Sequence, residues 1–368
     1  MALSPSELRR YSRHLSLTEI GLAGQEKLRA ARVLIVGMGG LGSPAALYLA
    51  AAGIGTLGLV DFDQVDESNL QRQILFDTAQ LGTPKTQAAS ERLRALNPQV
   101  RIIPHPIELR AANVSALLER YDLILDGSDR ITTHYLINDA CVLSRKPLVS
   151  AAIYRFEGQV MTYVPDRGAC YRCLFPHATP GAAPNCAEVG VLGVLPGVLG
   201  TLQATEAIKL IVGIGQPLIG RLLTYDALDL RFHELRATRR ADCAVCGEHP
   251  TIQAPSDPPD APDPPGVPGV TAQQLSQQLA GAVLIDVREP HEFAAGHISG
   301  ALNVPLSRIE REGLTLADAE HVVFICRSGT RSAKAVMSAR ASGYTSTRHL
   351  EGGLLAWRAQ IDPALRIY

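Results

Sequence analysis

Four of the chain's seven cysteines form two Cys-x-x-Cys pairs, Cys170 with Cys173 and Cys243 with Cys246. Each pair can offer two sulfur ligands from one tight turn, so together they predict a tetrahedral zinc site with four protein ligands. A zinc ion without an open position is structural, and it would fasten the end of the first domain to its middle. Redox-active pairs are the alternative, but neither motif is expected to open a helix in the thioredoxin manner.

A glycine-rich loop follows the apolar run 33–36 in the segment VLIVGMGGLG. Its glycines, Gly37, Gly39, Gly40 and Gly42, leave room for a phosphate group at a helix N-terminus, where backbone N–H groups and the helix dipole favour an anion. The loop therefore predicts a nucleotide site. The glycines alone do not decide between a dinucleotide such as NAD and a triphosphate such as ATP.

Polar residues further along the chain bear on that choice. Asp61 ends the next apolar run, where a carboxylate would hydrogen-bond ribose hydroxyls. Arg72 and Lys85 are candidate cations for a triphosphate, although an arginine and a lysine on polar loops are commonly just solvated. Asp126 and Asp129 end the strand DLILDGSD at the ligand-binding edge of a doubly wound sheet. Asp129 is a candidate ligand of Mg²⁺, and capping of the next helix is the alternative.

A further cysteine, Cys326, ends the apolar strand 321–325 and is followed by RSGTRS. A thiol in a loop that feeds a helix N-terminus, between Arg327 and Arg331, is expected to ionise readily and act as a nucleophile. A buried inert thiol is the alternative. Cysteine phosphatases have their arginine six positions after the nucleophile, whereas Arg331 is five positions on. The smaller ring of backbone N–H groups suits the sulfur of a persulfide or thiosulfate better than a phosphate.

The two remaining cysteines carry weaker signals. Cys186 lies in the turn-rich loop PGAAPNCAEVG, where a reactive and an incidental thiol are equally compatible with the sequence. Cys141 falls on a predicted core helix and is interpreted as a packing residue.

The elements that must position these residues alternate between strand and helix along residues 33–153, which predicts a doubly wound α/β sheet. The N-terminal segment SPSE is a capping box for a short helix whose basic face carries Arg13. A helix is expected at 201–212, and strands at 157–165, 220–225 and 232–235. A second, smaller α/β unit is predicted from a helix at 272, strands 282–287 and 321–325, a helix from 332 and a final helix around Trp357.

The length of 368 residues favours two or three domains, which we expect at 1–250 and 270–368. Between them, residues 251–269 form a proline-rich linker that reaches up to about 60 Å in polyproline conformation. Lys and Arg number 35 against 36 for Asp and Glu, without a basic run with aromatics, which argues against nucleic acid as a partner. A polar N-terminus and short apolar stretches predict a cytoplasmic protein that does not bind membranes.

Two resemblances cover nearly the whole chain. The ordered motifs RYSRHL, GMGGLGS, DFDQVDESNLQRQ, GTPK, DGSD, CYRCLF, NCAEVGVLG and CAVCG resemble the molybdopterin-synthase and thiamine-pathway adenylyltransferase family, relatives of ubiquitin-activating enzymes. From residue 270, the segments LIDVREPHEFAAGHISGALNVPL, CRSGTRS and LEGGLLAW closely resemble a single rhodanese domain. The fused architecture resembles a bifunctional adenylyltransferase and sulfurtransferase that activates ubiquitin-like sulfur carriers.

These resemblances imply specific roles. Arg13 would reach the triphosphate of the neighbouring subunit in a homodimer, Asp129 would hold Mg²⁺, and Cys326 would carry a persulfide. Cys186 matches a crossover-loop cysteine that takes up the acyl group or forms a disulfide. Arg130 departs from the family, which commonly has asparagine there. The implied ATP-binding set is Gly39, Gly40, Gly42, Asp61, Asp63, Ser68, Asn69, Arg72, Lys85, Asp129 and Arg130.

The function expected from the resemblance is adenylation of the C-terminal glycine of a Gly-Gly-ended carrier, followed by sulfur transfer that leaves a thiocarboxylate. The sulfur donor would be a cysteine desulfurase persulfide or thiosulfate. Molybdenum cofactor, thiamine, thiolated tRNA and cysteine pathways all stay open. Two alternatives are an NAD-dependent oxidoreductase with an appended sulfurtransferase domain and a non-catalytic scaffold for sulfur carriers.

Overall fold

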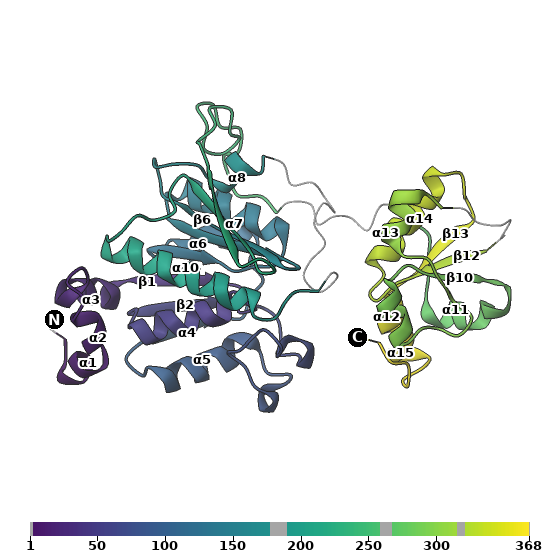
Figure 1. The fold of residues 1–368 in the computed structure, drawn as a ribbon, viewed down its shortest axis with the longest axis horizontal. Helices are drawn as coiled ribbons and strands as arrows, with labels where there is room; N and C mark the ends of the chain where they lie inside the picture. Colours follow the sequence, from purple (N-terminus) through teal and green to yellow (C-terminus); the bar gives the residue numbers. More distant parts are fainter. Residues whose placement is uncertain (1–2, 177–189, 258–266, 315–320, 368) are drawn as a thin grey trace. The chain divides into compact units, whose positions relative to one another are not determined.

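The computed structural model describes residues 3–176, 190–257, 267–314 and 321–367 (Figure 1). The chain divides into two compact units, residues 1–260 and 261–368. Both units combine helices with a largely parallel sheet, which confirms the predicted α/β class. Among the described helices, none combines the length and the apolar character needed to cross a bilayer.

One sheet organises the first unit, with the strand order β3-β2-β1-β4-β5-β6-β7-β8. The first five strands in this order, from β3 through β2, β1 and β4 to β5, pair in parallel, as the alternating pattern predicts. Strands β6, β7 and β8 continue the sheet in antiparallel register. The strands are β1 Arg32–Val36, β2 Thr56–Val60, β3 Arg101–His105, β4 Leu123–Asp126, β5 Leu148–Tyr154, β6 Glu157–Tyr163, β7 Arg221–Asp226 and β8 Arg231–Arg236.

Both faces of this sheet are covered by helices. Val33 and Ile35 of β1 pack into one core cluster and Leu34 and Val36 into another, because successive side chains of a strand point to opposite faces. The first cluster lies under α4 and α10, and the second under α6 and α7. The helices are α1 Pro5–Arg10, α2 Ser12–Leu15, α3 Gly21–Ala30, α4 Gly42–Ala52, α5 Lys85–Leu96, α6 Ala111–Leu118, α7 Ile131–Leu143, α8 Tyr171–Leu174 and α10 Leu195–Val212, with short 3₁₀ turns η1 Glu67–Asn69 and η2 Thr78–Gln80.

Helix α10 begins at Leu195, well before the predicted start at 201, because Pro196 is tolerated in the first turn of a helix. A Cβ added at Gly200 would lie 2.3 Å from the carbonyl oxygen of Leu41. This glycine therefore lets α10 pass closely over the start of α4 and places both helices beside the glycine-rich loop. Helix α3 was not predicted from the sequence.

The second unit has a five-stranded parallel sheet with the order β11-β10-β12-β13-β9. Its strands are β9 Gly269–Val270, β10 Val283–Asp286, β11 Leu302–Asn303, β12 Val322–Ile325 and β13 Thr347–Leu350. Its helices are α11 Ala272–Gln278, α12 Pro290–Ala295, α13 Leu306–Glu312, α14 Thr330–Ala341 and α15 Gly353–Gln360, with a 3₁₀ turn η3 Leu279–Gly281. Strands β10 and β12 are confirmed, whereas β9, β11, β13, α12 and α13 were not predicted.

Candidate active site

The glycine-rich loop joins β1 to α4 and lies directly against the loop after β4. Gly37 has φ +87°, and a Cβ there would lie 2.7 Å from the carbonyl oxygen of Gly127. A Cβ on Gly42 would lie 1.9 Å from the carbonyl oxygen of Gly37. These two positions need glycine for packing, whereas a Cβ on Gly39 would only touch Nε2 of Gln73, at 3.7 Å, and Gly39 faces the cavity described next.

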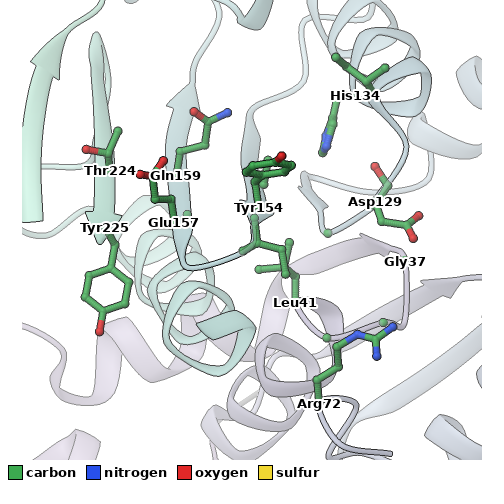
Figure 2. Close-up of a pocket in the computed structure, with 18 of the residues that line it drawn as sticks. Gly37, Leu41, Arg72, Asp129, His134, Tyr154, Glu157, Gln159, Thr224 and Tyr225 are labelled. Carbon is green, nitrogen blue, oxygen red and sulfur yellow. The ribbon is translucent and has the colours of Figure 1, made fainter. Parts of the chain in front are cut away.

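A cavity of about 650 Å³ opens at the carboxyl ends of β1 and β4, a size typical of small-molecule sites (Figure 2). Its lining includes seven of the residues predicted to bind nucleotide, namely Gly39, Gly40, Asp61, Asp63, Arg72, Lys85 and Asp129. Residues distant in sequence are thus gathered around one space, as expected for a ligand site at this edge of a parallel sheet.

Asp61 supports the glycine-rich loop from β2. Its carboxylate accepts hydrogen bonds from the backbone N–H groups of Met38, at 2.8 Å, and Asp63, at 2.9 Å. Burial raises the pKa of Asp61, and the charge of Lys85 opposes that rise. Each carboxylate oxygen has capacity for a further donor, so the predicted contact with ribose hydroxyls is compatible with this geometry.

The two candidate cations differ in their surroundings. Lys85 is only 5 % exposed, and its Nζ lies 2.9 Å from Oδ2 of Asp63. It is therefore not a solvated surface lysine. Arg72 is half-buried and donates from Nη1 to the carbonyl oxygen of Ser68, at 3.1 Å. Both side chains line the cavity, where an anionic ligand would meet them.

Other predicted site residues lie outside the cavity lining. Ser68 and Asn69 belong to η1, and Arg13 is exposed on α2. Arg130 forms an ion pair with Glu108, at 3.1 Å, and its guanidinium stands 5.3 Å from the ring centroid of Phe62. Gly42 lies at the start of α4, and Cys186 lies outside the described residues. Roles for these residues stay predictions.

A buried imidazole beside the cavity, that of His134, was missed from the sequence, although its partner Asp126 was placed at the ligand-binding edge. Asp126, at the end of β4, is fully buried and accepts hydrogen bonds from Ser128 N–H, Ser128 Oγ and Ser150 Oγ. Nδ1 of His134 lies 2.5 Å from Oδ2 of Asp126. Burial opposes ionisation of both groups, but their mutual attraction outweighs it, which lowers the pKa of Asp126 and raises the pKa of His134.

The position of His134 carried a usable signal. Helix α7 begins just after Asp129, so the inward residues of its first turn must lie near the ligand-binding edge. His134 lines the cavity, and in Figure 2 its ring points toward the space between Tyr154 and Asp129.

The outer part of the cavity comes from the antiparallel strands. Its polar lining residues belong to no motif, so the sequence carried no signal for them. They are Tyr154, Glu157, Gln159, Thr224, Tyr225, Asp226 and His233. This wall extends the space beyond the glycine-rich loop.

The four paired cysteines converge on one point, as predicted. Their sulfur atoms all lie within 4.8 Å of one another, with Cys170 Sγ 3.6 Å from Cys243 Sγ and Cys173 Sγ 3.4 Å from Cys246 Sγ. These separations exceed the S–S bond of about 2.05 Å and approach the edge of about 3.8 Å in a zinc tetrahedron with Zn–S bonds of about 2.3 Å. The donor set therefore fits zinc.

One expectation about these motifs is wrong. Cys170 is the N-cap of the short helix α8, so the first pair does open a helical turn. A metal site is favoured over a redox pair because the sulfur atoms of Cys243 and Cys246 lie close to those of Cys170 and Cys173, and not because a helix is absent.

In the second unit, Cys326 follows β12 and is held under the loop that leads into α14. The backbone N–H of Gly329 donates to its sulfur at 3.1 Å, and Ser332 Oγ lies 3.4 Å from the same sulfur. The thiol is only 1 % exposed. Arg331, expected to flank the thiol, forms a bidentate ion pair with Glu292 at 2.6 and 2.8 Å.

Comparison with known proteins matches both units. Residues 11–245 match the ThiF family, and residues 271–360 match the rhodanese-like domain. A Mycobacterium tuberculosis protein named "probable adenylyltransferase/sulfurtransferase MoeZ" is 43 % identical over 387 residues, covering 100 % of this chain and 97 % of that protein. A Thermus thermophilus "sulfur carrier protein adenylyltransferase" is 50 % identical over 257 residues, covering 68 % of this chain and 95 % of that protein.

Among solved structures, that of E. coli MccB with ATP is similar, with a TM-score of 0.56 and 25 % identity over 65 % of this chain and 74 % of the other. The similarity covers 65 % of the chain, which is close to the share of the chain that the first unit, residues 1–260, makes up. The chain therefore belongs to the ThiF family and is an adenylyltransferase that also carries a rhodanese-like sulfurtransferase domain.

Proposed function

We propose that the protein uses ATP to activate the C-terminal carboxylate of a ubiquitin-like sulfur carrier ending in Gly-Gly, and then converts it to a thiocarboxylate. The observation that carries this proposal is the cavity that gathers Gly39, Gly40, Arg72, Lys85 and Asp129. The same chain holds a loop cysteine in a rhodanese-like domain, and a relative is named a sulfur carrier protein adenylyltransferase.

The first step forms a bond between a carboxylate oxygen of the carrier and the α-phosphorus of ATP, and it breaks the bond to pyrophosphate. Negative charge grows on the departing pyrophosphate, so cations near it lower the barrier. Lys85 is buried and Arg72 lines the same cavity, which supports both in this role. The outer wall leaves room for an extended peptide end beside the glycine-rich loop.

Two metal ions belong to this proposal. The carboxylate of Asp129 lines the cavity and is the residue that would hold Mg²⁺, which supplies charge neutralisation for the phosphates when bound. Zinc would be held by Cys170, Cys173, Cys243 and Cys246 in a purely structural role.

In the second step, the terminal sulfur of a persulfide on Cys326 attacks the carbonyl of the acyl-adenylate, and AMP leaves. The product is an acyl disulfide between the carrier and Cys326. Attack of a second thiol on Cys326 Sγ breaks the sulfur–sulfur bond, releases the thiocarboxylate and leaves a disulfide between the two cysteines. Cys186 is our candidate for that thiol. The linker at 251–269 would tether the two domains and raise their effective concentration to about millimolar.

Several finer points complete the proposal. The enzyme works in the cytoplasm, as a homodimer in which Arg13 reaches the neighbouring subunit's site. A cysteine desulfurase persulfide or thiosulfate supplies the sulfur, and the carrier serves molybdenum cofactor or thiamine biosynthesis. Mixing the variants Arg13→Ala and Lys85→Met tests the dimer, because each mixed dimer regains one complete site. Activity that does not recover on mixing, in dimers shown to exchange subunits, would contradict this role of Arg13.

The decisive experiment incubates the full chain with ATP, Mg²⁺, thiosulfate and a Gly-Gly-ended carrier, and measures the intact mass of the carrier. We expect one oxygen to be replaced by sulfur, and Cys326→Ala to stop the process at the acyl-adenylate. A carrier that is neither adenylated nor thiolated by the wild-type protein would overturn the proposal.

A further inference from the structure

His134 is a histidine of the adenylation cavity whose role the proposed mechanism leaves open. It is only 5 % exposed, yet it lines the cavity, and its ring points into the space between Tyr154 and Asp129 (Figure 2). Among the described residues, Asp126 is the hydrogen-bond partner of its Nδ1, and none accepts a hydrogen bond from its Nε2.

The ring is held in one orientation from two sides. Asp126 binds Nδ1 at 2.5 Å, and Tyr171 stacks on the ring with centroids 5.7 Å apart and an interplanar angle of 27°. The Asp126 carboxylate also accepts hydrogen bonds from Ser128 and Ser150, so several groups besides the imidazole hold it in place. The ring is thus fixed through Nδ1, and Nε2 is left on its other side.

The charges around the cavity indicate a role for Nε2 of His134. The lining holds five carboxylates, Asp61, Asp63, Asp129, Glu157 and Asp226. Besides its two histidines it has one arginine and one lysine, Arg72 and Lys85, and Lys85 is already paired with Asp63. Both substrates of the proposed reaction bring further negative charge into this space. A fixed donor that carries positive charge is what such a site needs.

A general base has no task in this reaction, because the attacking carboxylate is already ionised at neutral pH. Resting on the proposed function, we propose that His134, oriented by Asp126, donates from Nε2 to an anionic oxygen of the substrates in the adenylation cavity. The oxygen belongs either to the α-phosphate of ATP or to the C-terminal carboxylate of the carrier. The contact with Asp126 supports the protonated ring that this donation requires.

Direct binding measurements on the full chain distinguish a contact of Nε2 with the α-phosphate of ATP from a contact with the carboxylate of the carrier. With His134→Gln, weakening of ATP and AMP binding by about 10-fold or more, with pyrophosphate binding unchanged, identifies the α-phosphate. Unchanged nucleotide affinity together with a similar rise in the KM for the carrier, in ATP–pyrophosphate exchange, identifies the carboxylate. His134→Arg retains a charged donor and is expected to recover part of the loss.

His105→Gln is the matched control, because His105 is a half-buried histidine that contacts Tyr121 Oη at 2.7 Å and does not line the cavity. It should change neither nucleotide affinity nor KM. Changes below twofold for every ligand in His134→Gln, in protein that keeps its melting temperature, would overturn the inference. If His134→Gln fails to fold, the same binding measurements are made on His134→Arg. Affinities of this variant that are well below the wild-type values for all ligands, with no selectivity among them, would also overturn the inference.

The nucleotide measurements do not depend on the carrier. A wild-type protein that binds ATP but shows no carrier-dependent exchange would therefore refute the proposed function while the binding data still test His134.

Discussion

Tyr171 stacks on His134, with ring centroids 5.7 Å apart and an interplanar angle of 27°. Tyr171 lies between Cys170 and Cys173, lines the cavity, and donates its backbone N–H to Asn138 Oδ1 at 2.8 Å. One residue thus connects the four-cysteine cluster to the wall of the adenylation site. Whatever holds the cysteines together also holds that wall.

Loss of the metal should therefore affect both stability and nucleotide binding. We expect about one zinc per chain in protein purified without chelators, and none in Cys243→Ser. The variant should melt about 5 °C or more below the wild type, because a structural zinc site contributes several kcal/mol to folding. It should also bind ATP more weakly, because Tyr171 is no longer held against His134. Metal analysis, thermal melting and ATP titration measure the three effects.

Cys141→Ala provides the control for this prediction. Cys141 is fully buried and burial raises its pKa, but it is not part of the four-cysteine cluster. The variant should retain its zinc. Full zinc content in Cys243→Ser would contradict the structural assignment of the cluster.

Lys85 should contribute to chemistry more than to folding. Its partner Asp63 has a side chain that is 49 % exposed, so Asp63 can be solvated when the lysine is removed. We expect Lys85→Met to lower the rate of ATP–pyrophosphate exchange by about 100-fold or more, as is typical when a charge-stabilising group is lost. Lys146→Met is the control, because Lys146 donates to the Tyr121 carbonyl oxygen outside the cavity. Equal rates for the two variants would remove Lys85 from the mechanism.

Much of this architecture follows from local sequence patterns. A buried run that ends in glycines specifies a strand, a tight turn and a helix, and two Cys-x-x-Cys pairs specify four ligands. These features depend on near neighbours in the chain, which explains why β1, α4 and the four-cysteine cluster are found where they were predicted.

The parts that escaped prediction depend on pairing between distant segments. Strands β9 and β11 have two residues each, too few to show any periodicity. Arg130 was expected at the phosphates, but its contacts with Glu108 and Phe62 come from loops that only the folded sheet brings together. The same holds for His134, since its partner Asp126 lies on a different element.

In the second unit, Ser332 should assist the thiol. Its hydroxyl donates to the Gly329 carbonyl oxygen at 2.8 Å, so in the present arrangement Cys326 must be the donor across the 3.4 Å contact between them. When the sulfur loses its proton, the hydroxyl can rotate and donate to it instead. We expect Ser332→Ala to lower thiosulfate sulfurtransferase activity by about 3- to 10-fold, the value of one hydrogen bond.

Adenylation in Ser332→Ala should stay at the wild-type rate, because Ser332 lies in the other unit. Ser328→Ala is the matched control, since Ser328 is exposed in the same loop and its Oγ contacts Thr330 Oγ1 at 3.4 Å. A loss in Ser328→Ala as large as that in Ser332→Ala would show that the loop as a whole, and not this hydroxyl, is responsible.

The ion pair between Glu292 and Arg331 should make the second unit sensitive to acid. Burial disfavours ionised Glu292, but hydrogen bonds from Arg331 and from the backbone N–H of Glu289 outweigh it and hold its pKa below the ordinary value of 4.5. The unfolded chain therefore takes up this proton at a higher pH than the folded one. The stabilisation is complete above about pH 4.5 and is lost as the pH falls through the lower pKa of the folded state.

Trp357 makes this testable, because it is the single tryptophan of the chain and is buried in the second unit. Unfolding followed by its fluorescence should give a melting temperature for Glu292→Gln well below the wild type at pH 7. The gap should narrow below pH 4.5 and close below the lower pKa of the folded state, because a protonated glutamate and a glutamine both lack the charge that pairs with Arg331. Glu312→Gln, which removes exposed ion pairs with Arg308 and Arg311, should produce only a small gap. A gap for Glu292→Gln that stayed constant from pH 7 to pH 3 would mean that packing, and not charge, accounts for the effect of Glu292.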